Sequence, residues 1–261
     1  LEDYKKAVEG EQTDKEKKTV FLYATDADAQ YSFIEAAKNR GYDVLLMDCQ
    51  LDSHFVNLLE AKMENVKFAR VDSDSIDNLI CKEEKIKPEM SETEQEDLSV
   101  IFKTVLPAGN EYYVQADNLG ADAAPILITQ SEFMRRYREM SAMGGGMNFY
   151  GEMPAMYNIT VNMENPLVAR IMEAKATEVA PAAVIPEAAS DASEDIKRTI
   201  TEAQETAAAS HKADLEAFAG GNEILKQITD LALLANGMLK GKELSEFIAR
   251  SARVGEDAYL K

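Results

Sequence analysis

The chain has 261 residues, a length that suits two domains or one large one. Its 47 acidic residues outnumber its 28 basic residues and give a net charge of −19. Because phosphate binding needs clustered Lys and Arg, this balance argues against nucleic acid and against an anionic membrane surface as partners. No apolar run reaches the length of a membrane span, and no signal peptide is present. The chain begins at Leu1 without an initiator Met, as expected of a piece of a longer protein.

The two cysteines, Cys49 and Cys81, are far apart and lack the spacing of a disulfide scaffold or a metal site. Free thiols in a reducing cytoplasm are the better interpretation, so we expect a cytoplasmic protein. Cys49 follows an apolar run and is expected to be a small core residue.

The first region, residues 1–78, has the pattern of a small α/β subdomain. The runs Val20–Ala24, Val44–Met47 and Val66–Val71 are apolar and β-prone. Between them, Tyr31–Ala37 and Phe55–Ala61 place apolar residues at helical spacing. Strand and helix alternate, which predicts a short parallel sheet covered by helices.

Residues 79–90 are predicted to be a linker, and residues 91–261 a C-terminal α+β domain. Ser91 and Glu94 form a possible capping box at a helix start. Strands are predicted over 111–115, 126–129 and 158–162. Asn165 before Pro166 marks another helix start, with a cap residue followed by Pro at the first helical position.

An Ala/Glu-rich insertion, about 177–221, comes next; it is predicted to be an extended linker and then a solvated helix, with His211 exposed. Two apolar helices are predicted over about 222–253, the first reaching as far as Leu239 and ending before Gly241. They have no obvious core of their own, which favours an intersubunit helical bundle in a homodimer. Packing back onto their own domain is the alternative. The predicted dimerisation residues are Ile224, Leu225, Ile228, Leu231, Leu234, Met238, Leu239, Phe247 and Ile248.

The segment FMRRYREMSAMGGGMNFYG, residues 133–151, joins a Met-rich amphipathic stretch to three glycines. Surfaces that accept many partners use flexible Met side chains, whereas Met at helical spacing is also typical of a core. Both interpretations stay open on the local pattern. The three glycines follow a helix, so they indicate a helix end and not a phosphate loop.

Asp26 and Asp28 follow the first strand and Asp48 and Asp52 the second, as in a magnesium-dependent phosphotransferase. Gln30 stands where that pattern needs Thr or Val, so solvated acidic loops are the better interpretation. His54 and His211 stand alone and indicate neither a triad nor a metal site. We therefore predict no catalytic and no metal-binding residue.

Several segments resemble the C-terminal part of a bacterial heat-shock protein 90 chaperone, of the HtpG type. LEDYKKAVEGEQ, RGYDVLLMDCQLDSHFV and VKFARVDSDS are similar to the end of the family's middle domain. QSEFMRRYREMSAMGGGMNFYGEMPAMYNITVNMENPLV and ILKQITDLALLANGMLKGKELSEFIARS resemble the C-terminal dimerisation domain. They occur in the family's order and cover most of the chain. His54 stands where the family commonly has Trp, and residues 177–221 are longer than the usual connection.

The resemblance implies an ATP-driven dimeric chaperone that binds unfolded or partly folded client proteins. ATP and magnesium would bind in an N-terminal domain absent from this chain, which would itself have no ATPase activity and no cofactor. The implied client-binding residues are Phe133, Met134, Tyr137, Met140, Met143, Met147 and Phe55. The alternatives are the magnesium-dependent phosphotransferase and a purely structural dimerisation module.

Overall fold

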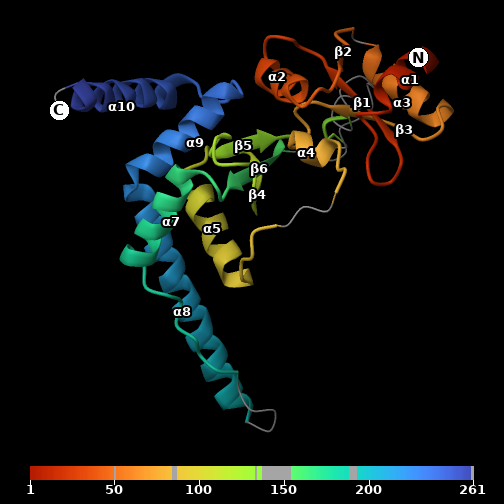
Figure 1. The fold of residues 1–261 in the computed structure, drawn as a ribbon. Helices are drawn as coiled ribbons and strands as arrows, with labels where there is room; N and C mark the ends of the chain where they lie inside the picture. Colours follow the sequence, from red (N-terminus) through yellow and green to blue (C-terminus); the bar gives the residue numbers. More distant parts are fainter. Residues whose placement is uncertain (50, 84–86, 133, 137–153, 188–192, 260–261) are drawn as a thin grey trace, which may run out of the picture. The chain divides into compact units, whose positions relative to one another are not determined.

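The computed structural model describes the chain except residues 50, 84–86, 133, 137–153, 188–192 and 260–261 (Figure 1). Its residues fall into two compact units. The first comprises Leu1–Ile86, Gly109–Tyr112 and Leu127–Ile159, and the second comprises Lys87–Ala108, Tyr113–Ile126 and Thr160–Lys261.

The first unit contains the predicted parallel sheet. Its strands β1 (Thr19–Ala24), β2 (Val44–Leu46) and β3 (Val66–Arg70) lie in the order β2-β1-β3. Both neighbours run parallel to β1, with Leu22 opposite Val44 and Phe21 opposite Phe68. Every residue of β1 is buried, because helices cover both faces of the sheet. The predicted α/β architecture is confirmed.

The alternation of side chains along β1 divides the first unit into two apolar cores. Val20, Leu22 and Ala24 face a core that also contains Leu79 and Ile80. Phe21 and Tyr23 face the other core, where the Phe21 ring meets the Phe68 ring edge to face. The helices of this unit are α1 (Glu2–Val8), α2 (Tyr31–Asn39), α3 (Asp52–Lys62) and α4 (Ile76–Leu79).

Cys49 is exposed, so its prediction as a core residue was wrong. It lies beyond the end of β2, in the turn that leads into α3. Its backbone N–H donates to Asp52 Oδ2 at 2.9 Å. The apolar run that precedes Cys49 ends at the edge of the sheet. Cys49 itself therefore lies outside the core.

A second sheet contains β4 (Glu111–Asp117), β5 (Ile126–Thr129) and β6 (Met156–Asn162), in the order β4-β6-β5. The predicted capping box is present at the start of α5 (Glu92–Thr104), where Ser91 and Glu94 bond reciprocally. Asn165 caps α7 (Pro166–Glu178) by accepting the N–H of Leu167. A second sheet together with the C-terminal helices matches the predicted α+β pattern.

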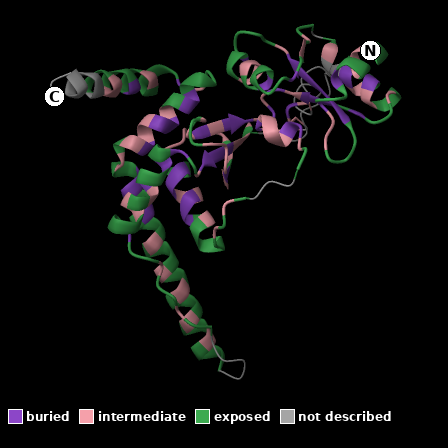
Figure 2. Ribbon diagram, in the orientation of Figure 1, coloured by how far each residue is buried: buried purple, intermediate pink, exposed green. Residues whose placement is uncertain are grey.

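Three further helices complete the second unit: α8 (Glu194–Gly221), α9 (Glu223–Ala235) and α10 (Gly241–Tyr259). The C-terminal end of α8 is buried at Leu215, Phe218 and Ala219, whereas its first half carries mostly exposed residues (Figure 2). The apolar pattern predicted one helix as far as Leu239, but α9 ends at Ala235. Gly237 adopts a positive φ of 65°, which terminates the helix earlier.

A buried carboxylate joins three helices of the second unit. Asp97 on α5 accepts hydrogen bonds from Lys175 Nζ on α7 at 2.6 Å and from His211 Nε2 on α8 at 2.9 Å. His211 was predicted to be exposed, and that prediction was wrong. The residues around His211 are polar, and they gave no sign that its imidazole ring points inward and contacts the buried carboxylate of Asp97.

Replacing Asp97 by Ala should lower the free energy of unfolding by about 2–4 kcal/mol, because Lys175 and His211 would lose their buried acceptor. Urea denaturation followed by circular dichroism measures the loss. The neighbouring Glu96→Ala variant is the control, since Glu96 is exposed and its loss should cost no more than about 0.5 kcal/mol. Equal stability of the two variants would contradict this role of Asp97.

Candidate functional site

Helix α3 carries an apolar stripe on its outer surface. Leu51, the N-cap residue of α3, and Phe55 and Leu58 within the helix are 69%, 47% and 48% exposed and recur at i, i+4 and i+7, the spacing of one helix face. Val56 and Leu59 lie beside this stripe on α3 and are buried in the core that contains Phe21 and Phe68. A single exposed apolar residue is ordinary, but three aligned on one helix form a patch that can contact a partner. We call these three residues the α3 stripe.

Of the predicted client-binding residues, Phe55 and Met134 are described, and they behave differently. Phe55 belongs to the α3 stripe, while Met134 is partly buried in the short helical stretch before residue 137. The others, Phe133, Tyr137, Met140, Met143 and Met147, lie outside the described residues.

The stretch that enters the Met-rich segment is fixed to the first sheet through Glu132. Tyr23 on β1 donates its hydroxyl to Glu132 Oε1 at 2.5 Å, and Arg135 Nη2 donates to the same oxygen at 2.7 Å. Arg135 Nη2 also donates to the Tyr23 hydroxyl at 2.5 Å. A carboxylate with this many donors can stay ionised although it is largely removed from water.

Arg136 extends this cluster to α3. Its Nε donates to Glu132 Oε1 at 2.6 Å, and its Nη1 donates to Asn57 Oδ1 at 2.9 Å and to Glu60 Oε2 at 2.8 Å. Both partners on α3 are therefore held by one guanidinium. We call Tyr23, Glu60, Glu132, Arg135 and Arg136 the anchor cluster; sequence patterns gave no signal for it, because its members are scattered along the chain.

The pKa values of the cluster reflect this pairing. Burial would raise the pKa of Glu132, but the cations of Arg135 and Arg136 and the Tyr23 hydroxyl outweigh it and hold that pKa below its ordinary value of 4.5. Burial and the Glu132 charge raise the pKa of Tyr23. Burial alone would lower the pKa of Arg136, yet its bonds to Glu60 and Glu132 raise it. These neighbours therefore favour the ionised form of Glu132.

The residues predicted for dimerisation divide into two groups. Leu225, Ile228, Leu239 and Phe247 are buried within this one chain. Leu231, Leu234 and Ile248 are 47%, 41% and 58% exposed, on the neighbouring helices α9 and α10. Ile224 and Met238 are partly buried. On α9, some apolar residues are therefore buried against their own chain, while others form an exposed apolar surface.

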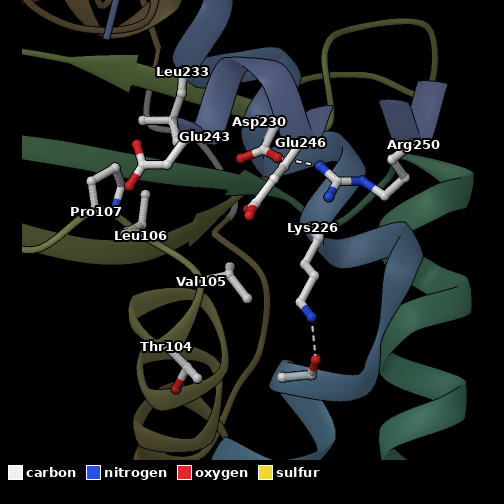
Figure 3. Close-up of a pocket in the computed structure, with 11 residues that line it drawn as sticks. Thr104, Val105, Leu106, Pro107, Lys226, Asp230, Leu233, Glu243, Glu246 and Arg250 are labelled. Carbon is white, nitrogen blue, oxygen red and sulfur yellow. Dashed lines mark hydrogen bonds and ion pairs between the residues drawn. The ribbon is translucent and has the colours of Figure 1, made fainter. Parts of the chain in front are cut away.

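A cavity of about 280 Å³ lies in the second unit, beside the ends of α5 and α8 and against α9 and α10 (Figure 3). Arg250 on α10 pairs with Asp230 and donates its Nε to Gln227 Oε1 at 3.0 Å. Lys226 Nζ donates to the carbonyl oxygen of Gly220 at the end of α8. Both cations thus join helices of this unit, and burial raises the pKa of Asp230 between them. The Arg250 contacts fix α10 on α9, and the Lys226 contact joins α9 to α8.

The acidic residues at the end of the first sheet stabilise the turns that follow its strands. Asp26 Oδ1 accepts the backbone N–H groups of Asp28 and Ala29, at 3.0 Å and 2.9 Å. Asp48 is exposed. Within the part of the chain that the structure describes, no three His, Cys, Asp or Glu residues lie close enough together to hold a metal ion. The same described part has no helix long and apolar enough to cross a membrane.

No protein-family model matches the chain. Chaperones are among the proteins that match it: HtpG of Porphyromonas gingivalis is 41% identical over 97% of this chain, and HtpG of Bacteroides fragilis and of Bacteroides thetaiotaomicron are each 39% identical over 96%. The chain spans about two fifths of the length of these relatives, 41% of the first and 40% of the others. Identity of 39–41% over almost the whole chain shows that it is homologous to part of these molecular chaperones. The chain belongs to the HtpG chaperones, the bacterial heat-shock protein 90 family.

Glu132 should make the stability of the first unit depend on pH. Because its pKa is lowered by folding, its contribution is present above pH 4.5 and is lost as the pH falls through the lower value of the folded state. The Glu132→Gln variant should therefore be less stable than the parent above about pH 5, and the difference should shrink as the pH falls further.

Urea midpoints measured between about pH 3 and pH 7 give this difference, and Glu64→Gln, at an exposed position, is the control. A difference between the Glu132→Gln variant and the parent that stays constant with pH would show that the Glu132 charge does not stabilise the fold.

Proposed function

We propose that this chain is the part of an HtpG chaperone that joins two subunits and offers client proteins a share of their binding surface. The complete protein would be an ATP-driven cytoplasmic homodimer, with ATP and magnesium bound outside this chain. The family membership supports the chaperone role. The α3 stripe supports client binding, and it is the observation that carries the proposal.

The α3 stripe has the chemistry that an unfolded client requires. An unfolded chain exposes apolar side chains, and burying them against Leu51, Phe55 and Leu58 removes apolar area from water on both sides. The stripe lies on a helix that is packed on a buried sheet, so little conformational entropy is lost when a client binds. The Met-rich segment, with Met140 and Met143, would add adaptable contacts.

The outward residues of α9 and α10 support dimerisation. Leu231, Leu234 and Ile248 are half-exposed on two adjacent helices that also bury other apolar residues against their own chain. Two copies of this surface could pack as a four-helix bundle with twofold symmetry, in which each copy supplies both helices. Met238 and Ile224 would lie at its edge.

Experiments can distinguish two alternatives from this proposal. A purely structural dimerisation module would form the dimer but would not bind clients. A magnesium-dependent phosphotransferase would use Asp26, Asp28 and Asp48, yet Asp26 already accepts two backbone N–H groups of its own turn. A magnesium titration followed by calorimetry tests that alternative directly.

Replacing Leu231, Leu234 and Ile248 together by Gln should weaken dimerisation by at least about a hundredfold, since each loses apolar burial in both subunits. Sedimentation velocity over a range of concentrations measures the change. Gln keeps helix propensity, and Ile196→Gln on the exposed half of α8 is the matched control. A parent chain that stays monomeric at every concentration would refute the proposed dimer.

Replacing Phe55 by Ser should weaken the binding of reduced, carboxymethylated α-lactalbumin, a permanently unfolded client, by about tenfold. The side chain is half-exposed, so the thermal midpoint should change little. Fluorescence anisotropy of the labelled client gives the affinity. Val184→Ser, at an exposed position in the second unit, controls for the loss of an apolar surface residue. An unchanged affinity for Phe55→Ser would remove α3 from the client surface.

A further inference from the structure

The Arg136 guanidinium connects two parts of the first unit that are distant in sequence. It contacts Asn57 and Glu60 on α3 and Glu132 in its own segment, at distances of 2.6–2.9 Å. A longer contact, at 3.4 Å, runs from its Nη2 to the carbonyl oxygen of Phe68 on β3. Its side chain is 14% exposed, so water and salt weaken these charge pairs far less than they weaken surface pairs.

We infer that Arg136 is a positioning residue for client binding, which fixes α3 against the Ser131–Arg136 stretch. The inference rests on the proposed function, because Phe55 on α3 and Met134 in that stretch both belong to the proposed client surface. Arg136 acts through its partners: Asn57 and Glu60 lie on a different side of α3 from Phe55.

Helix α3 depends on such a contact because the side chains that the structure describes give it few other attachments. Val56 and Leu59 are its side chains in the described core, and no side chain caps its N-terminus. Besides Arg136, Glu60 Oε1 accepts the N–H of Phe68 at 2.8 Å. An apolar stripe binds tightly only if its helix is held in place before the client arrives. The Arg136 guanidinium supplies that support through its contacts with Asn57 and Glu60.

The chemistry of these contacts requires arginine. A guanidinium directs several N–H groups in fixed directions, so one side chain can bind oxygens on two elements at once. A lysine keeps the charge but presents one compact ammonium, which cannot maintain the same set of bonds. Arg136→Lys therefore changes the geometry of the cluster while both Glu60 and Glu132 still face a cation.

Arg136→Lys should weaken binding of reduced, carboxymethylated α-lactalbumin by about fivefold. A change of this size is typical of the interaction energy between residues that contact each other. The whole chain is used, and anisotropy of the labelled client is measured as for Phe55→Ser. Arg198→Lys on α8 is the matched control, because its side chain is 71% exposed and its partners are surface carboxylates. Its client affinity should equal that of the parent.

Two further measurements separate positioning from a general loss of structure. Hydrogen exchange in Arg136→Lys should speed up at the amides of α3 and stay unchanged at those of α2, which has no contact with Arg136. The loss of client affinity caused by Phe55→Ser should also be smaller in the Arg136→Lys background than in the parent, because Arg136→Lys has already displaced the α3 stripe. Unchanged client affinity, or penalties that add fully, would overturn the inference.

Asn57→Ala is the second variant, and it keeps the inference testable if Arg136→Lys does not fold. It removes one bond between Arg136 and α3 and leaves every charge of the anchor cluster in place. Its client affinity should fall in the same direction as that of Arg136→Lys, and an unchanged affinity would count against the inference. If Phe55→Ser itself binds the client normally, the proposed function fails; if Phe55→Ser is weakened but Arg136→Lys and Asn57→Ala are not, only the positioning role fails.

Discussion

A carboxylate that is taken out of water must be surrounded by donors, and each unit of this chain fixes its outer elements through one such carboxylate. In the first unit Glu132 draws a tyrosine from β1 and two arginines into contact. In the second, Asp97 draws a lysine from α7 and a histidine from α8. Apolar packing alone is non-directional and would tolerate small displacements of these elements. The paired charges set their positions, because a displaced donor would leave a buried charge without a partner.

Much of the fold follows from local patterns in the sequence. The strands of both sheets were predictable from β-prone apolar runs, and Ser91 and Asn165 marked helix starts because caps obey strict local chemistry. The end of α9 was missed because its apolar pattern continues to Leu239, whereas Gly237 adopts a left-handed conformation and stops the helix. A glycine two residues beyond a helix end is a local signal that a long apolar run can conceal.

The site was less predictable, and the reason is distance along the chain. Family resemblance pointed to Phe55, and α3 does expose it. No periodicity could connect Arg136 with Asn57, which are 79 residues apart, or His211 with Asp97, which are 114 residues apart. A single sequence shows which residues can be charged but not which charges meet. His211 illustrates the limit: its neighbours are polar and exposed, yet its own ring is turned toward a buried acid.

Helix α9 shows how one sequence can serve a core and an outer surface together. Its apolar residues cover more of its circumference than one amphipathic face requires, and the buried ones, Leu225, Ile228 and Leu233, meet their own chain. Leu231 and Leu234 lie outside that face and stay half-exposed. One exposed leucine would be ordinary, but Leu231 and Leu234 lie on the same side of α9 and together form an apolar patch that the helix does not need to cover its own domain. Their presence is what a second apolar surface on the same helix requires, and Arg250 holds α10 against α9 so that Ile248 can extend it.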